Sequence, residues 1–87
     1  MNDEGTHARE RFITNMQQIA VGARLEFHGR IFSVLKQKQW ATSVDLTLRC
    51  GHRTIKVPVM LCHTGPSLSE SRLRFVAHAP SQRELIA

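Results

Sequence analysis

Two runs of alternating apolar and polar residues most strongly constrain how this chain can fold. Within residues 43–50 the even positions are apolar, and within residues 53–61 the odd positions beyond the first are apolar. Alternation with a period of two predicts half-buried β-strands, and the intervening Gly51-His52 predicts a hairpin turn. Pro58 lacks the N–H that a sheet ladder needs, so we expect the second strand at a sheet edge or with a bulge there.

The N-terminal part of the chain has a different periodicity. Its apolar residues recur with the 3.6-residue spacing of a helix, at Phe12, Ile13, Met16, Ile19 and Ala20. We predict a helix over residues 7–20 that ends before a left-handed Gly22. Residues 1–5 are expected to form a disordered tail.

Shorter alternating runs predict three further strands, over residues 23–28, 30–36 and 72–78. Residues 81–84 have the spacing of a capping box, which predicts a short C-terminal turn. A chain of 87 residues has room for one hydrophobic core. We therefore expect residues 6–87 to form a single α+β domain, with an N-terminal helix packed on a small, mostly antiparallel five-stranded sheet or barrel.

One segment resembles a known family. Residues 22–34 read Gly-Ala-Arg-Leu-Glu-Phe-His-Gly-Arg-Ile-Phe-Ser-Val, which resembles the opening hairpin of many SH3-like barrels. Barrels of this family, including those appended to translation factors and to transposases, show a glycine, an alternating strand, a glycine turn and a second strand. The resemblance implies that the sheet closes into an SH3-like barrel.

Positive charge is concentrated in the middle of the chain. The whole sequence carries a formal charge of +5, whereas residues 21–78 hold nine Lys or Arg against three Asp or Glu. Such a field favours nucleic acid, an acidic protein surface or an anionic membrane as partner. We see no apolar run near the ~20 residues of a membrane span and no secretory signal. Two cysteines are too few for a disulfide scaffold, so we expect a cytoplasmic protein without a membrane partner.

Alternation also predicts where these charges lie. If the strands at 43–50, 53–61 and 72–78 are neighbours, their outward-facing cations share one solvent face of the sheet. The predicted interface consists of Arg49, Lys56, Arg72 and Arg74, extended at its edges by Arg53, Lys36 and Lys38 and by Trp40 at the rim. Exposed aromatic residues are scarce, so we expect phosphate contacts with weak sequence preference.

Trp40 has two interpretations. Beside Lys36 and Lys38 it could stack on a base or anchor a partner protein. More commonly, a single Trp next to a hairpin covers one end of the core with its indole N–H reaching water. We favour the second interpretation.

No residue pattern indicates catalysis. Cys50, His52, Cys62 and His63 are potential zinc ligands, but a strand between the two pairs would separate them by roughly 27–30 Å. Only a sharp bend at Pro58 would bring them to one ion. Nucleophile–base pairs, paired carboxylates and phosphate-binding glycine loops are not recognisable. We expect no enzymatic activity, no cofactor and no metal.

Two functions fit these observations. The first is a small non-catalytic module whose basic sheet face contacts the nucleic-acid backbone. The alternative is a protein-interaction or inhibitor protein, an accessory factor of the phage or plasmid type, that docks on an acidic partner surface through its Arg-rich face and the edge strand near Pro58. A homodimer through the helix or an edge strand is compatible with both.

Overall fold

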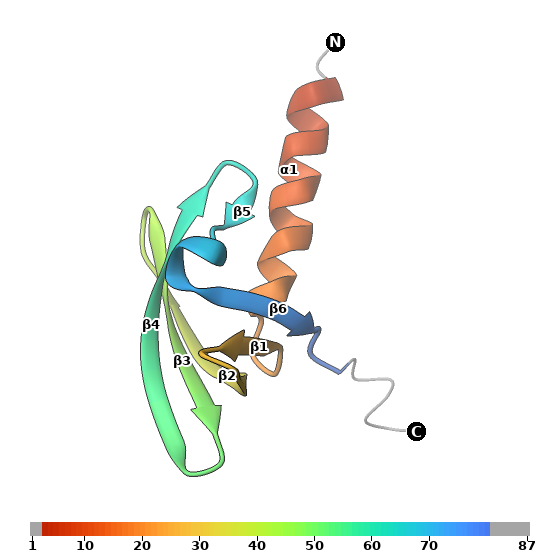
Figure 1. The fold of residues 1–87 in the computed structure, drawn as a ribbon. Coiled ribbons are helices and arrows are strands. Elements are labelled where there is room, and N and C mark those ends of the chain that lie inside the picture. Colours follow the sequence, from red (N-terminus) through yellow and green to blue (C-terminus); the bar gives the residue numbers. More distant parts are fainter. Residues whose placement is uncertain (1–2, 81–87) are drawn as a thin grey trace.

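The computed structural model describes residues 3–80, which form one helix and a curled antiparallel sheet (Figure 1). Helix α1 spans Asp3–Met16 and continues into the 3-10 turn η1, Gln17–Ile19. The strands are β1 Arg24–Phe27, β2 Arg30–Gln39, β3 Ser43–Cys50, β4 Arg53–Cys62, β5 Gly65–Pro66 and β6 Leu73–Ala77, with the 3-10 turn η2, Ser69–Ser71, before β6. The α+β class is as predicted.

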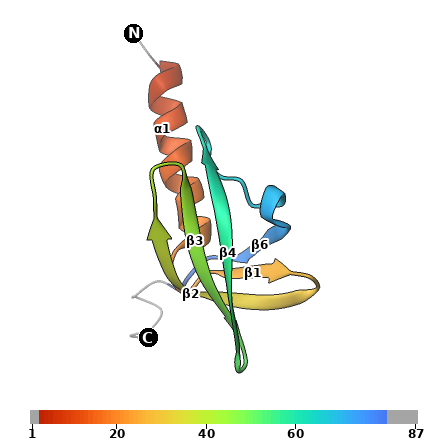
Figure 2. The ribbon, with the colours of Figure 1, turned by 90° about the vertical axis from the view of Figure 1, so that its left-hand side faces the viewer.

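The strands lie in the order β5-β4-β3-β2-β1-β6, and every neighbouring pair is antiparallel. The chain meanders from β1 to β4, and η2 then leads it to the far edge, where β6 pairs with β1. The first part of β2 pairs with β1 and the remainder with β3. The sheet bends along β2 for this reason and curls into a half-barrel (Figures 1 and 2).

The concave side of the half-barrel holds the core. The largest fully buried side chains come from β1, β3, β4 and η1 and are Ile19, Leu25, Leu46, Leu48, Val44 and Val59. The Gln37 side-chain amide donates to the Ile19 carbonyl at 2.7 Å, which ties η1 to β2. Burial of each such apolar side chain contributes about 1.5–3 kcal/mol to the stability of the folded state.

The structure differs from the predicted boundaries mainly at the helix. It begins at Asp3, so residues 3–5 are helical rather than part of a tail, and its α-helical part ends at Met16. The following turn tightens into η1, and Ile19 becomes completely buried. Strand β2 is longer than expected, and β5 is a sixth strand where five were predicted. The predicted C-terminal turn lies outside the described residues.

Strand β4 is an edge strand over most of its length, as Pro58 predicted. It pairs with β5 only at Leu61 and Cys62. On that side the Pro58 carbonyl accepts a hydrogen bond of 2.6 Å from the Ser71 hydroxyl, so η2 closes part of the gap beside the strand. None of the described helices is long and apolar enough to cross a membrane.

Candidate nucleic-acid interface

A β-bulge at Leu35 determines which side chains of β2 face solvent. Val34 lies opposite Leu48, whereas Lys36 already lies opposite Thr47, so Leu35 is the extra residue. A regular strand would place Lys36 on the same side as the buried Val34. The bulge reverses this alternation and brings Lys36 and Lys38 to the convex side of the sheet.

We call this convex side the outer face. Residues directly opposite each other in paired strands share a face, and three rows of such partners run across it. They are Arg24–Ser33–Arg49–Thr54, Lys36–Thr47–Lys56 and Lys38–Asp45–Pro58. Figure 2 looks toward β3 and β4 from this side, with α1 behind the sheet. The helix therefore leaves the outer face accessible.

All three lysines of the sequence line one hollow on the outer face. The hollow measures about 530 Å³, and its walls also include Trp40, Asp45 and the hydroxyl-bearing Thr47 and Thr54. Among the described residues the only ion pair joins Arg74 to Glu26, so these lysines have no carboxylate partner there. The hollow combines three ammonium groups, set against the one carboxylate of Asp45, with hydroxyl donors. Ammonium and hydroxyl groups are the ones that contact phosphate oxygens.

Trp40 is a wall of this hollow and not part of the core. Its side chain is 50% exposed. The indole N–H donates to Asp45 Oδ2 at 2.9 Å, and Lys38 Nζ lies 4.5 Å from the ring centroid. The favoured interpretation of Trp40 as a cover for the core is therefore wrong, because polar contacts on the outer face hold the ring instead.

Arg49 also lies on the outer face, as predicted, and its Nε donates to the Gly51 carbonyl at 2.9 Å. Arg24, which was not among the predicted residues, lies in the same row across Ser33. The alternation of residues 23–28 already placed Arg24 on a polar side. The sequence did not indicate the strand pairing through β2 that places Arg24 in the same row as Arg49.

The predicted arrangement of Arg72 and Arg74 is wrong in one respect: β6 does not neighbour β3 or β4. It pairs with β1 at the opposite edge, because Leu73 and Phe75 pack there opposite Phe27 and Leu25. Arg74 is bound to Glu26, with Nε 3.3 Å from Oε1. This hydrogen bond and the charge of Arg74 lower the pKa of Glu26.

Arg53 is likewise separated from the lysines. It lies opposite Cys50, in phase with the buried Leu48, and it lines a small pocket with Arg30 and His28 on the concave side. The predicted interface residues thus divide into two sets. Lys36, Lys38, Trp40, Arg49 and Lys56 share the part of the outer face formed by β2 to β4. Arg53 and Arg72 lie on other surfaces, and Arg74 lies at the β1–β6 edge of the sheet, where it is ion-paired with Glu26.

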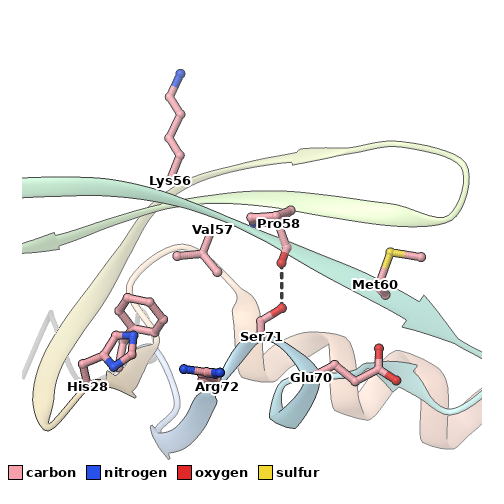
Figure 3. A pocket seen from close by; sticks show the side chains of 9 residues that line it. His28, Lys56, Val57, Pro58, Met60, Glu70, Ser71 and Arg72 are labelled. Carbon is pink, nitrogen blue, oxygen red and sulfur yellow. Dashed lines mark hydrogen bonds between the residues drawn. The ribbon is translucent and has the colours of Figure 1, made fainter.

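A second groove, of about 530 Å³, lies beside the open edge of β4 (Figure 3). Its apolar wall includes Phe27, Val57 and Met60, and Arg72 stands on the η2 side. Lys56 contributes to its rim, but the side chain points away from the groove, as Figure 3 shows. The groove at β4 is therefore chemically distinct from the lysine-lined hollow.

The four potential zinc ligands do not converge. Cys50 and His52 flank the start of β4, whereas Cys62 and His63 lie at its end. Both cysteines are free, and no group of three or more His, Cys, Asp or Glu gathers within residues 3–80.

Comparisons with known proteins leave the outer face to be interpreted from its own chemistry. The chain matches no protein-family model, and searches of curated proteins and of solved structures found no match. The arrangement of ammonium groups, hydroxyls and the indole is then what indicates a function.

Proposed function

We propose that this protein is a small, non-catalytic binding module that contacts the nucleic-acid backbone with the outer face of its sheet. The observation that carries the proposal is the gathering of Lys36, Lys38 and Lys56 around one hollow. Arg24 and Arg49 extend the positive charge along the adjacent row. Neutralising phosphates with such cations releases condensed counterions, which supplies sequence-independent affinity.

Two features favour phosphate over a carboxylate-rich protein surface at this hollow. Thr47 and Thr54 place hydroxyl donors among the lysines, and such donors commonly complement cations at phosphates. Asp45 accepts the indole N–H of Trp40, and its charge disfavours phosphates and acidic side chains equally, so it does not distinguish the two partners. The face is also accessible across three strands, β2 to β4, which suits an extended polyanion.

The experiment is a salt-stepped binding titration with labelled single-stranded RNA, single-stranded DNA and duplex DNA. We expect log-linear weakening with salt. Replacing two phosphate contacts in the double variant Lys36→Gln/Lys56→Gln should reduce the slope by about 1.4 for single strands. The matched control, Arg53→Gln/Arg72→Gln, removes the same charge from the other surfaces and should leave the slope unchanged. Absence of binding at low salt, or equal loss in both variants, contradicts the proposal.

The groove at β4 favours a second candidate function, the docking of an acidic partner protein. The groove offers an apolar wall at Val57 and Met60, with the exposed Arg72 and Glu70 beside it. The edge of β4 is open before Pro58, where an extended segment could pair with it, because the Pro58 and Met60 carbonyls already accept hydrogen bonds. Under this function the Arg53→Gln/Arg72→Gln variant would lose partner binding and Lys36→Gln/Lys56→Gln would keep it.

We further infer that the half-barrel is an SH3-like barrel and that the protein acts in the cytoplasm. Support for the barrel comes from the β1–β4 meander followed by a 3-10 turn and a strand that returns to β1. Support for the location comes from two free thiols, which a reducing compartment maintains. A homodimer is compatible with the open edges of β4 and β6.

A further inference from the structure

Trp40 is held in a fixed orientation at the surface. Its backbone N–H donates to the Ser43 carbonyl at 2.8 Å, and its indole N–H donates to Asp45 at 2.9 Å. Lys38 Nζ lies 4.5 Å from the ring centroid, a distance typical of a cation–π contact. These contacts restrain the ring through its polar edge and one cation while half of its surface remains exposed. A pre-oriented aromatic side chain loses little entropy when it binds a ligand.

The surroundings of Trp40 suit a nucleotide. The hollow beside the ring, at about 530 Å³, is roomy enough for a base and its sugar-phosphate, and Lys36 and Lys56 lie within the same hollow. A base could therefore stack on the indole while its flanking phosphates contact the ammonium groups. A duplex keeps its bases stacked on one another, so only an unpaired base can offer its face to a side chain.

We propose that Trp40 is a stacking platform for one unpaired base of a single-stranded nucleic acid, with Lys36 and Lys56 contacting the adjacent phosphates. This inference rests on the proposed function and adds the substrate class, single strands in preference to duplex. One platform stacks one base, so the discrimination comes from strandedness and not from sequence. Both RNA and DNA supply this chemistry, and they form separate arms of the test.

Trp40 is the only tryptophan and the chain has no tyrosine, so its intrinsic fluorescence reports on the platform directly. Single-stranded RNA or DNA oligonucleotides should quench this fluorescence, and a duplex of equal length should not. Trp40→Ala should weaken single-strand binding by about five- to a hundredfold. It should leave the salt slope and duplex binding unchanged, because no cation is lost. Trp40→Phe should recover part of the loss.

The Trp40→Ala variant and the fluorescence signal distinguish failure of the stacking platform from failure of the backbone interface. Equal single-strand affinity of wild type and Trp40→Ala, without fluorescence quenching but with salt-dependent binding intact, overturns the platform and leaves the backbone interface standing. Equal quenching by duplex and single strands overturns the preference for single strands. Loss of all salt-dependent binding in the wild type overturns both proposals. Retained duplex binding by Trp40→Ala shows that the variant is folded.

Discussion

Lys36 of β2 and Lys56 of β4 lie on either side of Thr47, and all three residues share the outer face. Two strand spacings of about 4.8 Å place the two lysine Cα atoms roughly 10 Å apart. At this separation the ammonium groups repel each other only weakly in water, yet both can contact one polyanion. Under the proposed function, this pair contacts neighbouring phosphates without a large cost in folding stability.

Asp45→Asn should strengthen nucleic-acid binding. The side-chain carbonyl oxygen of Asn can still accept the hydrogen bond that Asp45 receives from Trp40, while the only negative charge lining the hollow is removed. A unit charge about 6–8 Å from a phosphate in water contributes about 0.5–0.7 kcal/mol, which corresponds to a two- to threefold increase in affinity. Fluorescence anisotropy titrations at two salt concentrations measure this increase in affinity. The increase should be smaller at the higher salt concentration, because salt screens the charge.

The variant Asp45→Ala is the control for this prediction. It removes the same charge but also the acceptor for the indole N–H, so Trp40 loses its orientation. If Asp45→Asn and Asp45→Ala bind single strands equally, the hydrogen bond contributes nothing to recognition. Unchanged affinity in both variants would contradict the assignment of the hollow as the phosphate-contacting surface.

The sequence was sufficient to predict five of the six strands and insufficient to predict how they assemble. The alternation around Leu46 and Val57 is strict, because one side of that hairpin is buried, and its predicted boundaries were correct to within one residue. The bulge at Leu35 was not predicted, because the sequence around it was interpreted as one regular alternation, in which Lys36 would lie on the same side as Val34. The pairing of β6 with β1 is a long-range contact, and only the shared core of Leu25 and Phe75 determines it.

These two missing features explain the errors in the predicted interface. Without the bulge, Lys36 and Lys38 could only be placed at an edge of the basic patch, whereas both line the same hollow as Lys56. Without the β1–β6 pairing, Arg74 was assigned to the patch, although its partner is Glu26. Trp40 was favoured as a cover for one end of the core because a single Trp beside a hairpin commonly has that role. In the structure its indole N–H instead binds Asp45, five residues along the chain.

Gly65→Ala should destabilise the contact between α1 and β5. Gly65 has a φ of +125°, and a Cβ placed there would lie 2.8 Å from Asn15 Cβ, which a real contact cannot tolerate. Asn15 itself binds the Thr64 carbonyl at 2.7 Å, so its position cannot shift without losing that bond. Backbone strain and overpacking together should cost about 2–4 kcal/mol. Urea unfolding followed by circular dichroism measures the difference.

Gly51→Ala is the matched control for Gly65→Ala. Gly51 also has a positive φ, +63°, but an added Cβ meets no atom within 4 Å. Only the left-handed backbone penalty of about 1–2 kcal/mol is expected there. Equal destabilisation by the two variants would show that α1 does not press on β5 at Gly65.

The Glu26–Arg74 pair should give the protein a pH-dependent increment of stability. Arg74 lowers the pKa of Glu26 in the folded state from its usual value near 4.5. A carboxyl with a lowered folded pKa stabilises the fold above its unfolded pKa, and this stabilisation is lost as the pH falls through the folded pKa. Glu26→Gln should therefore lower Tm at pH 7, and the difference should disappear well below pH 4. A Tm difference that persists at pH 2 would mean that packing, not charge, is responsible.

Cys62 should be the faster-reacting of the two thiols. The Thr64 hydroxyl lies 3.2 Å from Cys62 Sγ, and hydrogen bonds from Thr64 and Ser67 lower the pKa of this exposed thiol. A lower pKa increases the thiolate fraction near neutral pH, and the thiolate is the species that alkylates. Iodoacetamide should alkylate Cys62 before the half-buried Cys50, as measured by peptide mass spectrometry. Thr64→Val should slow the alkylation of Cys62 and shift the midpoint of its rate–pH profile to higher pH. Equal rates at the two cysteines, or no change in Thr64→Val, would show that the Thr64 hydroxyl does not stabilise the thiolate.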